Sequence, residues 1–349
     1  RDFCLSRGLG DVYKRQLKNI HPLEVEQVSL VDAVGRVAAE NLTSDIDITP
    51  FAHAAMDGFA LKAAQIEGAT ADAPVKLKVV AEIPAGSTYE DDLAHDECVR
   101  IMTGAPIPAG ADCVIRQEDT DRGHPCVQIY QELRHHENYC FAGEDYQKGG
   151  VLLAAGTVLD AAALGVLAGA GLWERPMAVY PRPRVLLAGT GDELVWPGQP
   201  LKPGQIYNSN LPQLAARCRQ LGLAADTVWW PDDPQAVADG LTAGVRDFDC
   251  VITTGGVSVG DKDIFHQALP LAGAERLFWR VKLKPGTPLM FSLLEGRPVL
   301  SLSGNPFAAA ATFELLARPL LAALAGQRDW QPLTLTAPLA TPFSKASGG

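Results

Sequence analysis

The alternation of apolar and polar residues divides the chain into stretches with different hydrophobic patterns. From residue 184 onward, short apolar runs alternate with amphipathic segments. RVLLAG, ADTVWW and CVITT predict buried strands, and 210–221 and 234–245 predict helices between them. FWRVKL, PLMFSL and RPVLSL predict further strands, and Asn305-Pro306 opens a last long helix that Pro319 should kink or end. Strands and helices alternating at this spacing predict a mostly parallel, doubly wound α/β sheet.

Residues 75–133 have a different pattern, in which short alternating segments are separated by Gly, Pro and Asp. This pattern is typical of a small β-barrel or sandwich. The flanking stretches contain a short helix capped by Ser29 and an alanine-rich helix over 159–171. We therefore expect a β module inserted into an elongated domain. The predicted segments are a foreign or disordered start (1–16), the elongated domain (17–49 with 142–178), the β module (50–141), the α/β domain (179–326) and the stub of a C-terminal β domain (327–349).

Composition narrows the class of protein. The 349 residues are 47 % hydrophobic and 20 % charged, which is ordinary for a soluble globular protein. We see no apolar run of membrane-spanning length and no signal peptide, and the odd, scattered set of seven cysteines favours free thiols in a reducing cytoplasm. The net charge of −11 argues against nucleic acid as a partner. An anionic ligand would have to be held by local lysines and backbone N–H groups.

The stretch DCVITTGGVSVGDKDIF carries the clearest chemistry. A buried strand breaks at Gly255-Gly256 and a helix follows near Asp261, with Ser258 as its candidate cap. Glycines let the backbone approach a ligand, and the N–H groups at a helix start favour an anion. Three familiar motifs fit only in part: GVSVG lacks the distant histidine of a hydrolase triad, the P-loop spacing lacks Lys-Ser/Thr, and GTGDEL lacks the third dinucleotide-binding glycine.

Acidic residues gather at the predicted carboxyl ends of the strands, where ligands bind in such sheets. With them lie KPG (284–286) and SGNP (303–306), so a phosphate bound beside a divalent cation is favoured over simple helix capping, and Mg²⁺ suits the carboxylates. Asp57 precedes a glycine, and on spacing alone the pair favours a turn residue over a functional one. The acids at strand ends are Asp192, Glu193, Asp232, Asp233, Asp261 and Asp263.

These segments together resemble the bacterial molybdopterin molybdenumtransferase (MoeA) family, to which gephyrin is related. The matching motifs are PFAHAAMDGFA, RIMTGAPIPAGADCVI, GEDYQKGG, AGTGDELVWPGQPL, IYNSN, TTGGVSVGDKD, LKPGTPL and SGNPFAAAATFE, in the family's order over residues 17–326. The resemblance implies insertion of molybdenum from molybdate into adenylylated molybdopterin with release of AMP. It also implies Mg²⁺, a cytoplasmic homodimer whose cleft is shared between subunits, and a MogA-type adenylyltransferase as a possible partner.

The resemblance also implies roles for individual residues. Glu193, Asp57 and Asp192 are the expected catalytic residues, and Glu193, Asp261 and Asp263 the expected metal ligands. Asp57, Thr103 and Asp145 match polar positions that close the cleft from a second subunit. The expected substrate-binding residues are Thr103, Asp145, Thr190, Gly255, Gly256, Ser258, Asp261, Asp263, Lys282, Lys284, Pro285, Gly286, Ser303, Gly304, Asn305 and Pro306.

Several positions depart from the family pattern. The family reads DNSAMDGYA where this chain has Ala52, His53 and Ala55 before Asp57, and it carries arginines where this chain has 138–142. Thr287 replaces a frequent lysine. Losing fixed cationic donors should weaken the binding of molybdate. Two alternatives to the insertase therefore stay open: a pterin-nucleotide-binding scaffold that has lost metal insertion, and an adenylyltransferase or hydrolase built on the same α/β domain.

Overall fold

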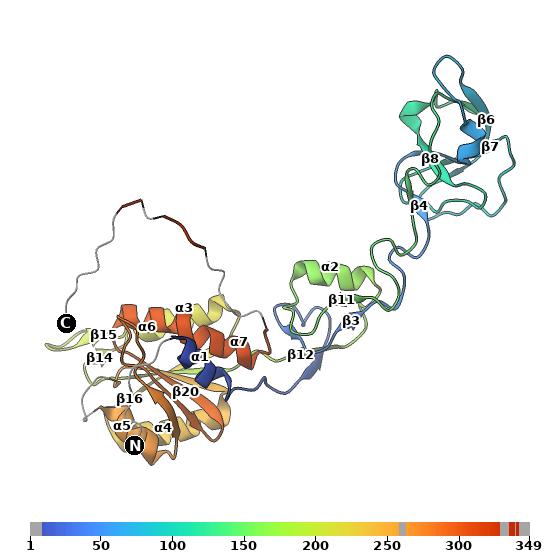
Figure 1. Ribbon diagram of the computed structural model, residues 1–349. Coiled ribbons are helices and arrows are strands. Elements are labelled where there is room, and N and C mark those ends of the chain that lie inside the picture. Colours follow the sequence, from blue (N-terminus) through green and yellow to red (C-terminus); the bar gives the residue numbers. More distant parts are fainter. Residues whose placement is uncertain (1–8, 258–262, 329–334, 339, 342–349) are drawn as a thin grey trace. The chain divides into compact units, whose positions relative to one another are not determined.

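The computed structural model describes residues 9–257, 263–328, 335–338 and 340–341 (Figure 1). The chain forms two compact units. Unit 1 comprises Arg1–Glu40, Ala155–Asp160 and Pro176–Gly349, and unit 2 comprises Asn41–Ala154 and Ala161–Arg175. The finer division into five segments stays a prediction.

Unit 1 is built around a six-stranded sheet with the order β16-β13-β17-β20-β19-β18. The first four strands are parallel, as the alternating pattern predicts, whereas β19 and β18 are antiparallel. Only Glu295 and Gly296 join β19 to β20, and so short a connection cannot cross over to a parallel strand. The strands are β13 (Val185–Thr190), β16 (Ala225–Trp230), β17 (Cys250–Thr254), β18 (Glu275–Trp279), β19 (Met290–Leu294) and β20 (Arg297–Leu302).

Helices cover both faces of this sheet (Figure 1). On one face α3 (Asn210–Gln220) and the helix that begins with α6 (Pro306–Thr312) pack on β13, β17 and β20. On the other face α4 (Pro234–Asp247) and α5 (Ile264–Leu271) enclose a second apolar core. Two buried layers around one sheet confirm the predicted doubly wound α/β fold.

The chain start departs from expectation. α1 (Leu9–Leu17) is a regular helix whose Val12 is fully buried in the core of unit 1. The Tyr13 hydroxyl donates to the carbonyl of Leu315 (2.6 Å), and Gln16 Nε2 donates to that of Leu316 (2.9 Å). The prediction of foreign or disordered residues is therefore wrong for 9–16, while residues 1–8 lie outside the described part. Leu9, Val12, Tyr13 and Leu17 recur at helical spacing, a short pattern that the sequence reasoning overlooked.

The last helix is longer than expected. α6 passes through a π-helical turn (Phe313–Ala317) into α7 (Arg318–Leu324), so Pro319 does not end it. We attribute this continuity to the wider π turn, which changes the hydrogen-bond pattern just before a residue that has no N–H to donate. Pro306–Leu324 is long and apolar enough to cross a membrane, but 56 % of its most apolar stretch is buried inside the protein, as in a core helix.

Short strands complete unit 1. β1 (Glu26–Val28), β12 (Met177–Tyr180) and β2 (Val37–Ala38) form a three-stranded sheet, and β14 (Leu194–Val195) pairs with β15 (Ile206–Tyr207). The short helix predicted after Ser29 is absent: residues 30–36 form turns, and Val37 pairs with Tyr180. Gly35 has a positive φ of 74°, which ends any helical continuation there.

Unit 2 contains the predicted β module, a five-stranded sheet with the order β8-β5-β7-β6-β9 and an apolar core on each side. Two-stranded pairs, β10 with β4 and β11 with β3, complete it, together with helix α2 (Ala161–Gly169) inside the predicted alanine-rich stretch. The strands are β3 (Leu42–Thr43), β4 (His53–Ala54), β5 (Gly58–Leu61), β6 (Val75–Ile83), β7 (Glu97–Ile101), β8 (Cys113–Arg116), β9 (Cys126–Ile129), β10 (Tyr139–Cys140) and β11 (Val151–Leu153), with 3₁₀ turns Ala63–Ile66 and Gln117–Asp119.

Candidate active site

A cavity of about 710 Å³ opens at the carboxyl ends of the parallel strands of unit 1. The chain leaves β13 toward β16 on one side and later returns to β17 on the other, so the strand order reverses between β13 and β17. Such a reversal leaves a crevice where ligands bind in open α/β sheets. The predicted site residues that line the cavity are Thr190, Glu193, Gly255, Gly256, Asp263, Ser303, Gly304 and Asn305.

Two glycine turns bring the ends of β17 and β20 together. Gly255 and Gly256 have positive φ angles of 92° and 62°. A Cβ on Gly255 would lie 2.6 Å from the carbonyl oxygen of Thr190, and one on Gly304 would lie 3.3 Å from Gly255 Cα. The backbones therefore pack at distances that side chains would prevent, which leaves main-chain groups exposed to the cavity.

A buried amide fixes this arrangement. Asn210 Nδ2 donates to Thr254 Oγ1 (2.8 Å) and to the carbonyl of Gly304 (2.9 Å). The Thr254 hydroxyl donates in turn to the carbonyl of Ser303 (3.1 Å). Asn210 and Thr254 were not among the predicted site residues, although both fall within the motifs IYNSN and TTGG. Their role is to hold the two turns in register.

The turn after β20 continues into α6. Asn305 is the N-cap of this helix, and its Oδ1 accepts the N–H of Ala308 (3.0 Å). Pro306 is the first helical residue, as the sequence predicts, and it does not line the cavity. The SGNP motif thus has a structural role in starting the core helix, in addition to the role that we predict for it at the cavity.

Carboxylates form the opposite rim of the cavity. Asp232, just after β16, lines it together with Glu193 and Asp263. Asp192 stands beside it: its N–H donates to Asp232 Oδ2, and Asp232 N–H donates to Asp192 Oδ1, both at 3.3 Å. The pKa of Asp232 is raised, chiefly because surrounding protein removes part of its hydration and further because Asp192 and Glu193 are negative. Asp192, Glu193 and Asp232 thus place like charges close together at this rim.

Replacing Asp232 by asparagine is expected to stabilise the protein slightly at neutral pH. The folded-state pKa of Asp232 lies above its unfolded value, so its stabilising contribution is present below the unfolded pKa and is lost as pH rises through the folded pKa. We expect Asp232→Asn to raise the unfolding free energy at pH 7 by about a few tenths of a kcal/mol, because water screens an exposed carboxyl group. Urea unfolding at several pH values measures this.

The gain should shrink as pH falls and vanish well below the unfolded pKa of Asp232, where the wild-type carboxyl group is neutral in both the folded and the unfolded state. Asp226→Asn, which removes an exposed carboxylate within β16 itself, serves as the control. An equal gain in both variants at every pH would contradict a specific raised pKa at Asp232.

The carboxylates of the rim can be compared with the ligands that the expected Mg²⁺ would need. Within the described ranges, no three His, Cys, Asp or Glu side chains form a group that could hold a metal ion by themselves. Mg²⁺, however, is usually held by one or two carboxylates together with substrate phosphates. Glu193 and Asp263 open into the same cavity, so their oxygen donors fit such a shared site. Asp261, the third predicted ligand, and Ser258 lie outside the described residues.

The predicted lysine loop stands next to the cavity. Lys282, Lys284 and Pro285 are exposed, and none of them lines the cavity, although Pro288 of the same loop does. Gly286 is buried at a φ of 111°, and a Cβ there would lie 2.7 Å from Thr312 Cγ2. Lys282 and Lys284 are thus on a loop that is anchored to the core helix, and their contact with a substrate stays a prediction.

Two residues near this loop were missed by the sequence reasoning. Gln267, on α5, lines the cavity. Arg280 lies with its guanidinium 4.2 Å from the ring centre of Trp279, and its buried Nε has no hydrogen-bond partner in the described part of the chain. Neither residue type is distinctive in sequence. Only the fold brings Gln267 to the cavity, and Arg280 is not among the residues that line it.

The remaining predicted residues belong to unit 2. Asp57 Oδ1 accepts both the backbone N–H and the hydroxyl of Thr103 (2.8 and 2.7 Å). These hydrogen bonds, that of the N–H first, lower the pKa of Asp57, with a smaller contribution from Arg100. Asp145 is exposed and its N–H donates to the carbonyl of Ile48. The structure therefore joins Asp57 with Thr103, but no described contact joins Asp145 to them.

The structure of the neighbouring Gly58 tests the interpretation of Asp57 as a turn residue. Gly58 pairs with both Ile101 and Arg116, and a Cβ on it would lie 1.8 Å from the carbonyl oxygen of Ile115. The glycine of the MDG motif is thus required by strand packing in β5 and not by a turn. Asp57 stands at the start of a strand with an exposed, ionised carboxylate.

Removing the Thr103 hydroxyl is expected to raise the pKa of Asp57. Thr103→Val deletes one hydrogen bond to the carboxylate and keeps the backbone N–H, so the pKa should move toward its usual value without reaching it. Carboxyl-carbon NMR titration of Asp57 measures the change. Thr103→Ser, which retains the hydroxyl, should leave the titration unchanged; a shift in both variants would contradict the assignment.

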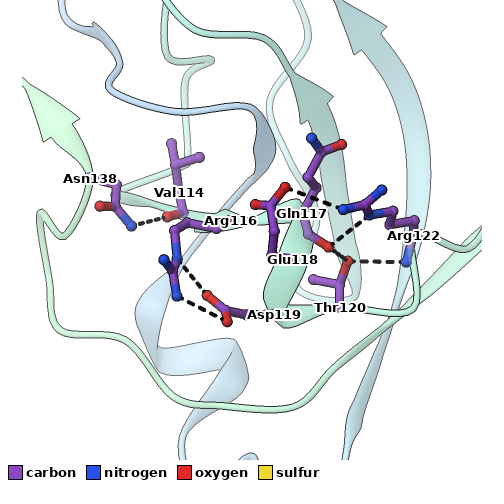
Figure 2. Close-up of polar contacts among 8 residues, drawn as sticks. All are labelled: Val114, Arg116, Gln117, Glu118, Asp119, Thr120, Arg122 and Asn138. Carbon is purple, nitrogen blue, oxygen red and sulfur yellow. Dashed lines mark hydrogen bonds and ion pairs between the residues drawn. The ribbon is translucent and has the colours of Figure 1, made fainter.

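Neighbouring arginines of unit 2 are bound to carboxylates of the same turn (Figure 2). Arg116, opposite Gly58, makes two contacts with Asp119 (2.7 and 3.1 Å), and Arg122 contacts Glu118 (3.2 Å). Asn138, in the stretch where arginine is expected, donates instead to the carbonyl of Val114 (2.9 Å). Arg116 and Arg122 are thus engaged locally, which limits how far they can replace the missing guanidiniums.

The fold and the cavity define a class, and comparisons with known proteins agree. Residues 188–323 match the family model described as a probable molybdopterin binding domain. The class is therefore that of molybdopterin-binding α/β domains. Residues 9–171 match the MoeA N-terminal region, domains I and II.

Relatives identify the family more closely. The chain is 37 % identical over 317 residues to a molybdopterin molybdenumtransferase of Nostoc sp., covering 89 % of this chain and 72 % of that protein. It is 38 % identical over 330 residues to molybdopterin molybdenumtransferase 2 of Mycobacterium tuberculosis, covering 91 % and 80 %. A crystal structure of the MoeA protein of Pyrococcus horikoshii matches with a TM-score of 0.80 and 28 % identity, covering 93 % of this chain and 81 % of that one. The chain belongs to the molybdopterin molybdenumtransferase family, a family of transferase enzymes in molybdenum cofactor biosynthesis.

Proposed function

We propose that this chain inserts molybdenum from molybdate into adenylylated molybdopterin and releases AMP. The observation that carries this proposal is the cavity between β13 and β17, where two glycine-containing turns face an acidic rim. Main-chain groups suit a phosphate, and the carboxylates suit a cation bound to it. The names of the relatives point to the same reaction.

The two sides of the cavity have different tasks in this proposal. The turns at Gly255-Gly256 and 303–305 bind the phosphates of the pterin nucleotide, and the exposed Lys282 and Lys284 offset their charge. During the reaction one oxygen of molybdate is transferred to phosphorus as the bond between the two phosphates breaks, and AMP leaves while the pterin keeps its own phosphate. The two dithiolene sulfurs take the place of two molybdate oxygens on molybdenum, and the second of these oxygens leaves as water with the thiol protons.

The acidic residues orient the reacting groups. Glu193 and Asp263 would hold Mg²⁺, which supplies charge neutralisation at the phosphates, and Asp261 would join them. Asp192 keeps Asp232 in place through their reciprocal hydrogen bonds. Glu193 also folds back over Gly191, because a Cβ on that glycine would lie 2.7 Å from Glu193 Oε2. This placement puts the exposed Glu193 side chain at the cavity that it lines.

We further propose a cytoplasmic homodimer. In this arrangement Asp57, Thr103 and Asp145 of a second copy would close the cavity, with the ionised Asp57 fixed by Thr103. A MogA-type adenylyltransferase would supply the substrate. Sedimentation of the purified chain tests the dimer, and a monomer at micromolar concentration that remains active would contradict the shared cleft.

AMP release tests the proposed reaction. Purified chain is incubated with adenylylated molybdopterin, with and without molybdate and Mg²⁺, and AMP is measured. The proposal predicts release that requires both. Release that is indifferent to molybdate would indicate a hydrolase, and nucleotide binding without release would indicate a scaffold.

A further inference from the structure

A second cavity in unit 1, away from the strand ends, is lined by arginines. It has a volume of about 300 Å³ and lies among the β2–β12 region, the end of α3 and α7. Its wall includes Arg36, Arg182 and Arg318, and its apolar floor includes Leu223 and Leu321. It shares no lining residue with the candidate active site. In a chain with a net charge of −11, such a concentration of guanidiniums is unexpected.

The carboxylates around this cavity do not balance the arginines. Arg36 pairs with Glu26, and Glu314 is shared between Arg318 (3.7 Å) and Arg217 (2.6 Å). The three arginines that line the cavity, together with Arg217 beside it, thus share two carboxylates. Arg182 donates to the carbonyl of Val34, and within the described residues no carboxylate lies within 4.0 Å of it.

One guanidinium atom at this cavity is also unsatisfied. The Nε of Arg36 is buried and has no hydrogen-bond partner in the described ranges. A buried donor without an acceptor is costly, and an anion is the acceptor that guanidiniums bind best. The charge surplus and the orphaned donor are independent observations, and both point to a missing anionic group.

We propose that this cavity binds a small organic anion, a carboxylate or phosphate monoester attached to one ring or a short apolar chain. Its volume lies at the low end for ligand pockets, so it suits a single ring better than a nucleotide. The arginines bind the anionic group, and the leucines of the floor cover the apolar part. Because the walls come from separate elements of unit 1, a bound ligand would bridge the β2–β12 region and α7.

Phenyl phosphate is the probe that tests this site, by calorimetric titration of the full chain. We expect it to bind, and to bind at least about tenfold more tightly than either inorganic phosphate or phenol. Arg182→Gln and Arg318→Gln should each weaken binding about tenfold. Arg246→Gln, an exposed arginine of α4 outside the cavity, should leave it unchanged.

A second measurement uses the wild-type chain and so does not depend on the variants folding. Phenylglyoxal modifies accessible arginines, and bound phenyl phosphate should protect Arg182 and Arg318 but not Arg246 in peptide mass spectra. No binding, equal affinity for phenol or phosphate, unchanged affinity in folded Arg182→Gln and Arg318→Gln, or protection of none of the cavity arginines would each overturn the proposal.

Discussion

Gly255→Ala is expected to destabilise unit 1 and to lower its activity strongly. At a φ of 92° an alanine is strained, and its Cβ would lie 2.6 Å from the carbonyl oxygen of Thr190, which belongs to the neighbouring strand backbone. Strain alone costs about 1–2 kcal/mol, and the clash forces β13 and β17 apart at the cavity. We expect the unfolding free energy to fall by about 2–4 kcal/mol, and kcat/KM for AMP release to fall about a hundredfold or more.

Gly273→Ala separates the cost of backbone strain at a positive φ from the cost of the steric clash. Gly273 also has a positive φ of 78°, but a Cβ there would meet nothing within 4 Å. This variant should lose about 1 kcal/mol of stability and retain its activity. Denaturant unfolding and steady-state kinetics of both variants make the comparison. Normal activity in a folded Gly255→Ala chain would contradict the role given to the close backbone approach.

Glu193→Ala has the second large effect, and it acts on the reaction more than on the fold. The side chain is exposed to the cavity and makes no described hydrogen bond that the fold requires, so stability should change by less than about 0.5 kcal/mol. We expect molybdate-dependent AMP release to fall about a hundredfold or more, because a carboxylate that positions a cation or charged intermediate is lost.

The same substitution predicts a change in ionisation. The negative charge of Glu193 is one of the influences that raise the pKa of Asp232, so that pKa should fall in Glu193→Ala. Glu275→Ala, an exposed glutamate on edge strand β18, is the matched control and should affect neither quantity. Equal losses of activity in both variants, or full activity in Glu193→Ala, would contradict the assignment.

The sequence predicts the sheet and the location of the cavity because both depend on local signals. Apolar runs such as CVITT become central strands, and the glycines that end them mark where the backbone can approach a ligand. The antiparallel edge follows from a two-residue connection, which could have been recognised. The place of α1 in the core could not, because it depends on contacts with Leu315 and Leu316, some 300 positions away.

In the candidate site, too, contacts between residues far apart in the sequence could not be predicted. Glu193, Gly255 and Ser303 are recognisable one motif at a time, whereas the Asn210 bridge between two motifs appears only once β17 and β20 are neighbours. Likewise, Asp57 and Thr103 were each predicted, but their hydrogen bonds depend on the pairing of β5 with β7. The functional roles of all these residues stay predictions.

The most direct test of the account is the ratio of molybdenum transferred to AMP released. After a single turnover with molybdate and Mg²⁺, the pterin product is separated from protein and its molybdenum is measured by mass spectrometry, beside the AMP. The account predicts molybdenum in the pterin fraction equal to the AMP released, and little of either with Glu193→Ala. AMP released without molybdenum in the pterin would contradict it, because the chain would then hydrolyse the adenylylated pterin without inserting the metal.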